Sequence, residues 1–271
     1  MRSLFLILLF VPLLAKASCE GSLISTVADK VRLSIDFEVS SRSPTGRDGG
    51  VLFGCKAIQG NPGLAAIAFA SINDKATKSD KFYGGKNYAD LEPGNGRYDL
   101  TVVLARESDQ KILGRYFGRG ELESNAVLLE SVGIDPASYK LSITALTFGV
   151  RVFNTSRSSS YIAADDTLSL FSFKNGTLTK VLDKLTVKSD SGNLKNFCGV
   201  SADVDHVTRY VIVSKSETNG MRNLIVRTIK KNLSVPEGCD GAESEQETEA
   251  KIGDEKQEYV FDGKIYIRKG L

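Results

Sequence analysis

Three short turn signals divide the second half of the chain into β-hairpins, and they constrain its fold more than any other feature. Asn-Gly occurs at residues 175–176 and again at 219–220, and Asp-Gly occurs at 262–263. Each dipeptide tolerates the positive φ angles of tight hairpin turns, and each lies between apolar stretches with strand-like alternation. The pattern therefore predicts consecutive antiparallel strands, most clearly over residues 141–187.

Other parts of the chain favour the same class. Residues 31–39, VRLSIDFEV, alternate apolar and polar side chains and predict a half-buried strand. Residues 51–58, 99–105 and 111–117 predict further strands, while 63–72 and 122–132 fit either a strand or a short helix. We expect an all-β antiparallel meander of about a dozen strands, and the sequence leaves a two-sheet sandwich and a propeller-like arrangement open.

Three polar segments are expected to connect these strands. Residues 73–97 combine charges with several glycines and predict a long excursion. Residues 189–193 predict a polar turn. The acidic segment 238–258 predicts a flexible loop, because no aromatic residue occurs in it before Tyr259.

The first residues have the composition of a secretory signal peptide. Arg2 precedes an apolar run over residues 4–14, and Ala15-Lys16-Ala17 fits a cleavage site. We therefore expect residues 1–17 to be removed, leaving one all-β domain over 18–271 with a possible sub-boundary near 190–197. No later segment predicts a transmembrane helix, so we expect a secreted protein, in the periplasm of a bacterial cell.

The four cysteines are Cys19, Cys55, Cys198 and Cys239, and an even number in a secreted chain suggests two disulfides. No C-x-x-C pair occurs and the chain has one histidine, which argues against a zinc site of the usual spacing. Three pairings are possible. We expect Cys19–Cys55 and Cys198–Cys239, since a strand or hairpin that runs out and back brings each pair together.

The charge of the chain argues against a nucleic-acid partner. It has 35 basic and 33 acidic residues, and loss of Arg2 and Lys16 with the signal peptide leaves 33 of each. The distribution is uneven, however. A basic hairpin over residues 207–231 is a candidate for binding an anionic partner through Arg209, Arg222, Arg227, Lys230 and Lys231. The interpretation we favour is that it pairs with the acidic segment 237–258 of the same chain.

The sequence contains few residue patterns typical of a catalytic, cofactor or metal site. The chain shows no phosphate-binding glycine loop and no nucleophile elbow, so we expect no cofactor. Asp203 and Asp205 lie two apart on a predicted strand and are candidate ligands for a hard cation together with His206. The first hypothesis is a non-enzymatic, envelope-associated domain that binds a protein or an envelope component. The alternative is a carboxylate- or cation-dependent hydrolase of envelope glycans.

Residues 95–104, NGRYDLTVVL, resemble the strand entry of FG-GAP-type propeller repeats. The D-x-D-x-D-G loop of those repeats does not accompany them, so the resemblance implies neither calcium nor a closed propeller. The layout as a whole is similar to uncharacterised secreted β-rich proteins of Gram-negative bacteria. That similarity implies a compartment and no activity.

Overall fold

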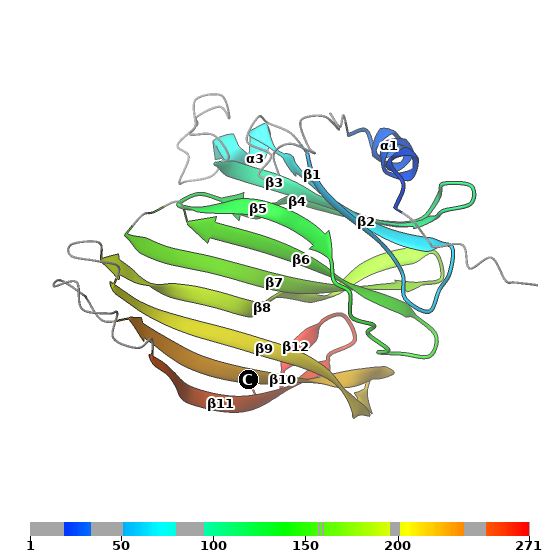
Figure 1. The fold of residues 1–271 in the computed structure, drawn as a ribbon. Coiled ribbons are helices and arrows are strands. Elements are labelled where there is room, and N and C mark those ends of the chain that lie inside the picture. The colour runs from blue at the N-terminus through cyan, green and yellow to red at the C-terminus, as the bar shows by residue number, and fades with distance from the viewer. Residues whose placement is uncertain are drawn as a thin grey trace, which may run out of the picture.

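The computed structural model describes residues 19–33, 51–79, 95–156, 158, 160–195, 201–235 and 248–270. These residues form two antiparallel sheets (Figure 1). Within each sheet, every strand pairs with its neighbours in sequence, so each sheet is a meander, and the all-β prediction is confirmed. Of the two arrangements that the sequence left open, the structure has the one built from two packed sheets.

The first sheet has four strands and the second has eight. The first comprises β1 Leu52–Ala57, β2 Leu64–Ile72, β3 Gly96–Arg106 and β4 Lys111–Ser124. The second comprises β5 Val127–Ile134, β6 Leu146–Ser156, β7 Tyr161–Lys174, β8 Thr177–Lys195, β9 Ser201–Thr218, β10 Met221–Val235, β11 Thr248–Phe261 and β12 Tyr266–Arg268. Two helices, α1 Gly21–Lys30 and α3 Asp74–Ser79, complete the described elements, and no helix among them is long and apolar enough to cross a membrane.

Strand β2 is the centre of a three-layer body. Its residues 65–70 are fully buried, which explains why the run 63–72 is apolar without alternation. One face of β2 packs under α1 and the other packs on the second sheet. The face toward α1 carries Ala65, Ile67 and Phe69, and the face toward the second sheet carries Ala66, Ala68 and Ala70.

Helix α1 covers the outer face of the first sheet and is an element that the sequence reading missed. Leu23, Ile24, Val27 and Ala28 recur at helical spacing and are buried against β2 and β3. The strand expected over residues 31–39 is wrong at its start, since Val31 caps α1 and is buried beside it. Residues 34–39 lie outside the described residues.

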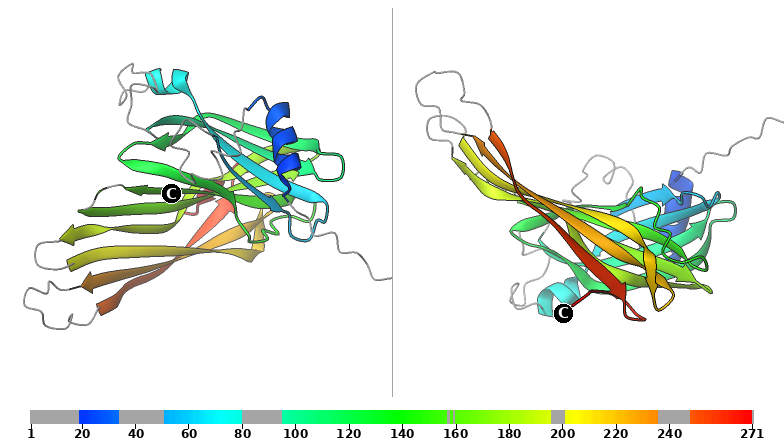
Figure 2. Two further views of the ribbon diagram at one scale, coloured as in Figure 1. Left: turned by 45° about the horizontal axis from the view of Figure 1, so that its top comes forward. Right: turned by 90° about the horizontal axis from the view of Figure 1, so that it is seen from below.

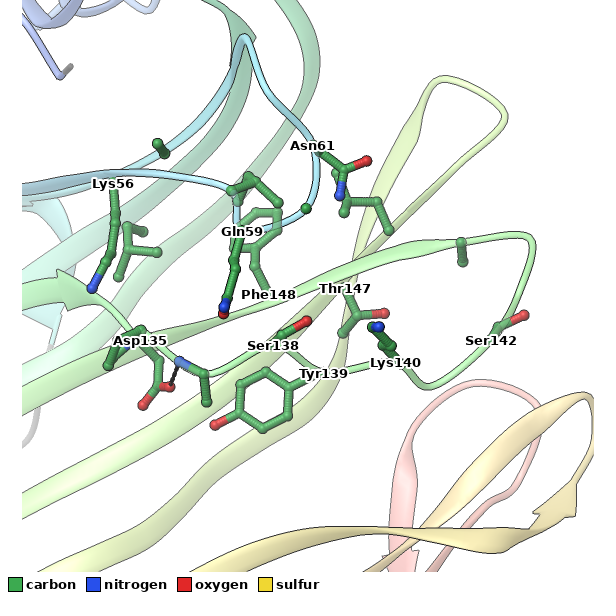
Figure 3. Close-up of a pocket in the computed structure, with 18 of the residues that line it drawn as sticks. Lys56, Gln59, Asn61, Asp135, Ser138, Tyr139, Lys140, Ser142, Thr147 and Phe148 are labelled. Atoms are coloured by element: carbon green, nitrogen blue, oxygen red, sulfur yellow. Dashed lines mark hydrogen bonds between the residues drawn. The ribbon is translucent and has the colours of Figure 1, made fainter. Parts of the chain in front are cut away.

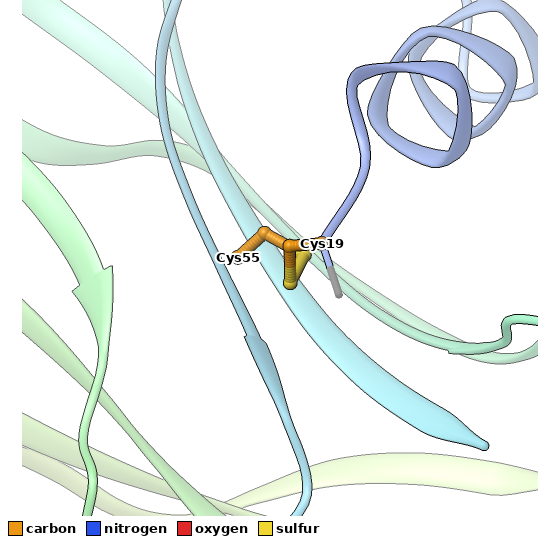
Figure 4. Close-up of a disulfide and its surroundings, with 2 residues drawn as sticks. All are labelled: Cys19 and Cys55. Atoms are coloured by element: carbon orange, nitrogen blue, oxygen red, sulfur yellow. A yellow bond between two sulfur atoms is a disulfide. The ribbon is translucent and has the colours of Figure 1, made fainter. Parts of the chain in front are cut away.

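The Cys19–Cys55 disulfide confirms the first expected pairing (Figure 4). It joins the chain just before α1 to strand β1, and so holds the helix against the sheet that it covers. Cys198 and Cys239 lie outside the described residues. Disulfides persist in oxidising compartments and are rare where thiols are kept reduced.

The second sheet continues well beyond the first. The far ends of β8, β9, β10 and β11 project past the sandwich as a twisted blade (Figure 2). The turns at 175–176 and 219–220 have two consecutive positive φ angles, which confirms both hairpin predictions. Asp262 caps the third turn by accepting hydrogen bonds from the amides of Lys264 and Ile265, and this hairpin is confirmed as well.

Two expected loops are strands instead. Residues 189–193 lie within β8, where they pair with β7 and β9, and residues 248–258 lie within β11, where they pair with β10. Strand pairing supplies their backbone hydrogen bonds despite the polar side chains. A domain sub-boundary was expected near residues 190–197, and strand β8 of the second sheet continues through the described residues of that range, 190–195. Of the excursion 73–97, α3 occupies the start, and residues 80–94 lie outside the described residues.

The two sheets come closest where β1 crosses β5. A Cβ atom at Gly54 would lie 2.5 Å from the carbonyl oxygen of Val132 and 2.6 Å from the Cα of Gly133. On the other side of the sandwich, Lys180 of β8 donates to Glu121 of β4 at 2.9 Å. The first contact requires glycine, because any side chain at residue 54 would push backbone against backbone.

We expect Gly54→Ala to lower the free energy of unfolding by about 1–3 kcal/mol, as overpacking does in other cores. Urea unfolding followed by circular dichroism measures this. Gly133→Ala is the matched control, because a Cβ there meets no atom within 4 Å. Equal stability of the two variants would show that the sheets do not meet at this crossing.

Candidate functional site

A cavity of about 700 Å³ opens at the end of the sandwich, where the β1–β2 turn faces the loop between β5 and β6 (Figure 3). We call it the end cleft. Its floor and walls include the buried rings of Tyr139 and Phe148. The polar and charged side chains that line it are Lys56, Gln59, Asn61, Asp135, Ser138, Tyr139, Lys140, Ser142, Thr144 and Thr147.

The β1–β2 turn presents one wall of the end cleft. The amide of Ile58 donates to the carbonyl of Leu64 at 2.8 Å, and the amide of Asn61 donates to that of Ile58 at 3.1 Å. Gly60 and Gly63 have φ angles of 78° and 81°, which favour glycine. The buried side chain of Ile58 anchors this turn, which leaves the amide side chains of Gln59 and Asn61 along the cleft.

The β5–β6 loop forms the opposite wall and is fixed by the carboxylate of Asp135. That side chain is 1% exposed, accepts a hydrogen bond from the amide of Ala137 at 2.7 Å, and pairs with the guanidinium of Arg151. Arg151 also donates to Asp166 at 2.6 Å. Asp135 therefore holds the loop in place through its hydrogen bond with the Ala137 amide, and the guanidinium of Arg151 compensates the charge of the buried carboxylate.

Further along the loop, Tyr139 and Leu141 are buried in the core beneath the second sheet. The carbonyl of Leu141 accepts a hydrogen bond from the amide of Arg222 at 2.8 Å. Burial raises the pKa of the Tyr139 hydroxyl, and the charge of Asp135 raises it further. This hydroxyl therefore stays protonated at any physiological pH, and the loop is held at several points.

Lys56 and Lys140 give the end cleft a positive charge. Both side chains are exposed, and neither forms an ion pair within the described part of the chain. Among the described residues of the lining, Asp135 is the one carboxylate, and Arg151 already neutralises it. The cleft is therefore suited to a negatively charged ligand.

The hydroxyl of Thr147 is an unsatisfied group in the same lining. Thr147 is 6% exposed, and its Oγ1 has no hydrogen-bond partner among the described residues. A buried hydroxyl without a partner costs roughly 1–3 kcal/mol of stability. Such groups in native structures call for an explanation, and a bound water, ion or ligand is one.

The described residues that line the end cleft do not include the groups of a hydrolytic site. They contain neither histidine nor cysteine, and Asp135 is the one carboxylate among them. Glycoside hydrolysis ordinarily requires two carboxylates flanking the scissile bond.

The structure separates the three residues predicted to form a cation site. Asp203 and Asp205 share one face of β9, where both accept hydrogen bonds from the side-chain amide of Asn232, at 2.9 and 3.0 Å. His206 points to the opposite face, because successive strand residues alternate, and contacts Asp190 at 2.7 Å. The predicted three-residue site is therefore not assembled. No group of three or more potential ligands lies together in the described ranges.

The predicted basic residues are largely engaged within the chain. Arg227 makes two hydrogen bonds to Asp254, at 2.9 and 2.6 Å, and Lys230 contacts Glu255 at 3.1 Å. These contacts show that part of the basic hairpin pairs with the described part of the acidic segment. Arg209 donates to the Thr186 carbonyl at 2.9 Å, and Arg222 lies 3.7 Å from Glu217. Lys231 lies opposite His206 on the neighbouring strand.

Sequence reasoning did not find the end cleft. Asp135-Pro136 and the glycines of the β1–β2 turn predict turns, but nothing in the sequence indicates that the two turns face each other. Comparison with family models, with curated proteins and with solved structures found no match for this chain.

We expect Thr147→Val to leave the free energy of unfolding unchanged or to raise it slightly, because it removes an unpaired buried hydroxyl at nearly constant volume. Thr77→Val is the matched control. The Thr77 hydroxyl is also buried, but it donates to the Asn73 carbonyl and accepts from the Arg97 amide, both at 2.9 Å.

The control should lose about 1–3 kcal/mol in urea unfolding, because its valine removes both hydrogen bonds of the buried Thr77 hydroxyl. If Thr147→Val lowers the free energy of unfolding by a comparable amount, the Thr147 hydroxyl has a hydrogen-bond partner in the free protein. The Thr147 hydroxyl would then no longer support a bound ligand.

Proposed function

We propose that this protein is a non-catalytic binding protein that holds an acidic saccharide in the end cleft. The observation that carries the proposal is the coincidence, in one cavity, of two lysines without a carboxylate partner among the described residues and a buried hydroxyl without a hydrogen-bond partner among them. A sugar acid supplies a carboxylate for Lys56 or Lys140 and hydroxyls for Thr147.

The size and lining of the cleft fit this class of ligand. A volume near 700 Å³ falls within the range of roughly 300–1,000 Å³ that is usual for small-molecule sites. Short hydroxyl and amide side chains, such as those of Gln59, Asn61 and Ser138, hydrogen-bond to sugar hydroxyls in either direction. The anchored loop keeps these groups in place, which lowers the entropy lost on binding.

The location that we propose is outside the cytoplasm. The predicted signal peptide and the Cys19–Cys55 disulfide both support secretion, with the periplasm as the expected compartment. A ligand met in that compartment is an acidic polysaccharide of the cell envelope or of the surroundings.

The proposal is tested by isothermal calorimetry with tetragalacturonate, and with maltotetraose as the neutral saccharide of similar length. We expect tetragalacturonate to bind and maltotetraose to bind at least tenfold more weakly. Lys56→Met and Lys140→Met should each weaken binding by roughly three- to tenfold, allowing for the exposure of both side chains. Lys174→Met, an exposed lysine beside the 175–176 turn, should change nothing.

We also expect Thr147→Val to weaken the binding of tetragalacturonate by roughly three- to tenfold without lowering the free energy of unfolding. Equal binding of the acidic and neutral saccharides would contradict the role of the lysines. Binding of neither saccharide would reject the saccharide class for this cleft.

A further inference from the structure

An exposed aromatic ring on strand β4, at the edge of the first sheet, is flanked by two arginines. Arg115, Phe117 and Arg119 are alternate residues of this strand, and all three are exposed. Strand register places Arg115 opposite Val103 and Phe117 opposite Thr101, so both lie on the outer face of the sheet, which α1 covers in part (Figure 1). We call Arg115, Phe117 and Arg119 the arginine patch.

The exposure of Phe117 is not explained by the needs of an edge strand. Charged side chains on such a strand protect it from pairing with other chains. A phenylalanine that is 51% exposed has the opposite effect, because it leaves apolar surface in contact with water. Tyr116, on the other face of β4, packs against the core between the sheets. The exposed ring therefore indicates a contact with a partner.

Four cations lie on and beside β4 without a matching anion. Neither arginine of the patch forms an ion pair with a described residue, and the same holds for the exposed Lys75 and Lys78 of α3. Helix α3 lies against β4 directly after Arg119, because a Cβ atom at Gly120 would lie 2.8 Å from the Cβ of Ala76.

The two carboxylates of β4 are engaged elsewhere. Glu121 accepts a hydrogen bond from Lys180 at 2.9 Å, and Glu123 lies 3.2 Å from Arg97. These carboxylates therefore do not neutralise the arginine patch, and the positive surface suits an anionic partner.

The geometry of the arginine patch favours a lipid surface over a soluble polyanion. The guanidinium of Arg115 lies over the Phe117 ring, 5.7 Å from its centroid. A sugar or a base would have to displace this guanidinium in order to stack on that face of the ring. At a bilayer surface, by contrast, the ring enters the headgroup region while the arginine stems lie along apolar surface and their charged ends stay in water. Guanidinium groups also bind phosphate through two parallel hydrogen bonds.

We propose that the arginine patch docks the protein on an anionic phospholipid surface, with Phe117 inserted among the headgroups. Arg115 and Arg119 bind lipid phosphates, and the two lysines of α3 add attraction to the negative surface. None of these residues lines the end cleft, so docking does not occupy it. The inference is independent of the saccharide that we propose for that cleft.

The first experiment uses tryptophan fluorescence, because the chain contains no tryptophan of its own. The full mature chain carrying Phe117→Trp is mixed with vesicles made of equal parts of phosphatidylglycerol and phosphatidylcholine. We expect its emission to shift to the blue and to be quenched by brominated acyl chains. Phe153→Trp is the matched control, since Phe153 is a phenylalanine of the second sheet that is 39% exposed, and it should show neither change.

Two results of this experiment would overturn the proposal. One is an unchanged emission of Phe117→Trp with phosphatidylglycerol present, and the other is equal quenching of the two variants. Vesicles of phosphatidylcholine alone should leave the emission unchanged, and an equal shift with them would contradict the role of the arginines.

Vesicle sedimentation of further variants then locates the docking surface. Arg115→Gln and Arg119→Gln should each weaken binding to the phosphatidylglycerol vesicles by roughly fivefold, the usual effect of one cation near an anionic surface. Phe117→Ser should also weaken it, while Lys264→Gln, at an exposed lysine of the β11–β12 turn, and Lys56→Met, in the end cleft, should not. Unchanged binding by the double arginine variant would contradict the assignment to this patch.

The last comparison separates a lipid surface from a soluble polyanion. A heparin-derived tetrasaccharide should leave the emission of Phe117→Trp unchanged. A blue shift as large as that with vesicles would overturn the assignment to lipid and assign the patch to an acidic polysaccharide. Binding of tetragalacturonate in the end cleft is measured separately by calorimetry, so the failure of one proposal is distinguishable from the failure of the other.

Discussion

The burial of β2 on both faces is the constraint on which the rest of the body depends. A strand with apolar residues on both sides requires a covering layer on each, and here α1 supplies one and the second sheet supplies the other. The alanines of β2 let the second sheet approach closely, as Gly54 does where β1 crosses β5. That approach brings the β1–β2 turn over the β5–β6 loop, and so creates the end cleft.

The blade is stabilised differently, because no described element covers it as a second layer (Figure 2). Its strands are held by register and by polar pairs across strands, such as Arg227 with Asp254 and Asn232 with Asp203. A sheet with two wet faces has few apolar residues to bury and can carry charged groups on either side. The end cleft lies apart from the blade, in the layered part of the molecule where both sheets line it.

Elements whose signal is local were predicted well. The turns at 175–176, 219–220 and 262–263 form as expected, since Asn-Gly and Asp-Gly fix the backbone within a few residues. Helix α1 was missed because its short 3.6-residue pattern precedes a stronger alternating run, and only packing on β2 makes it a helix. Residues 248–258 were taken as a loop because they are acidic, yet pairing with β10 makes them a strand.

By itself, the sequence determined the all-β class and the order of hairpins, because both depend on residues close together in the chain. It also predicted the Cys19–Cys55 pairing, although helix α1 and not an outgoing strand follows Cys19. Only the tertiary structure decided which side chains share a surface. The end cleft joins Lys56 to Lys140 through the stacking of two sheets, and register sets Lys231 beside His206. One residue of slip would move Lys231 to the other face, and no local pattern fixes that register.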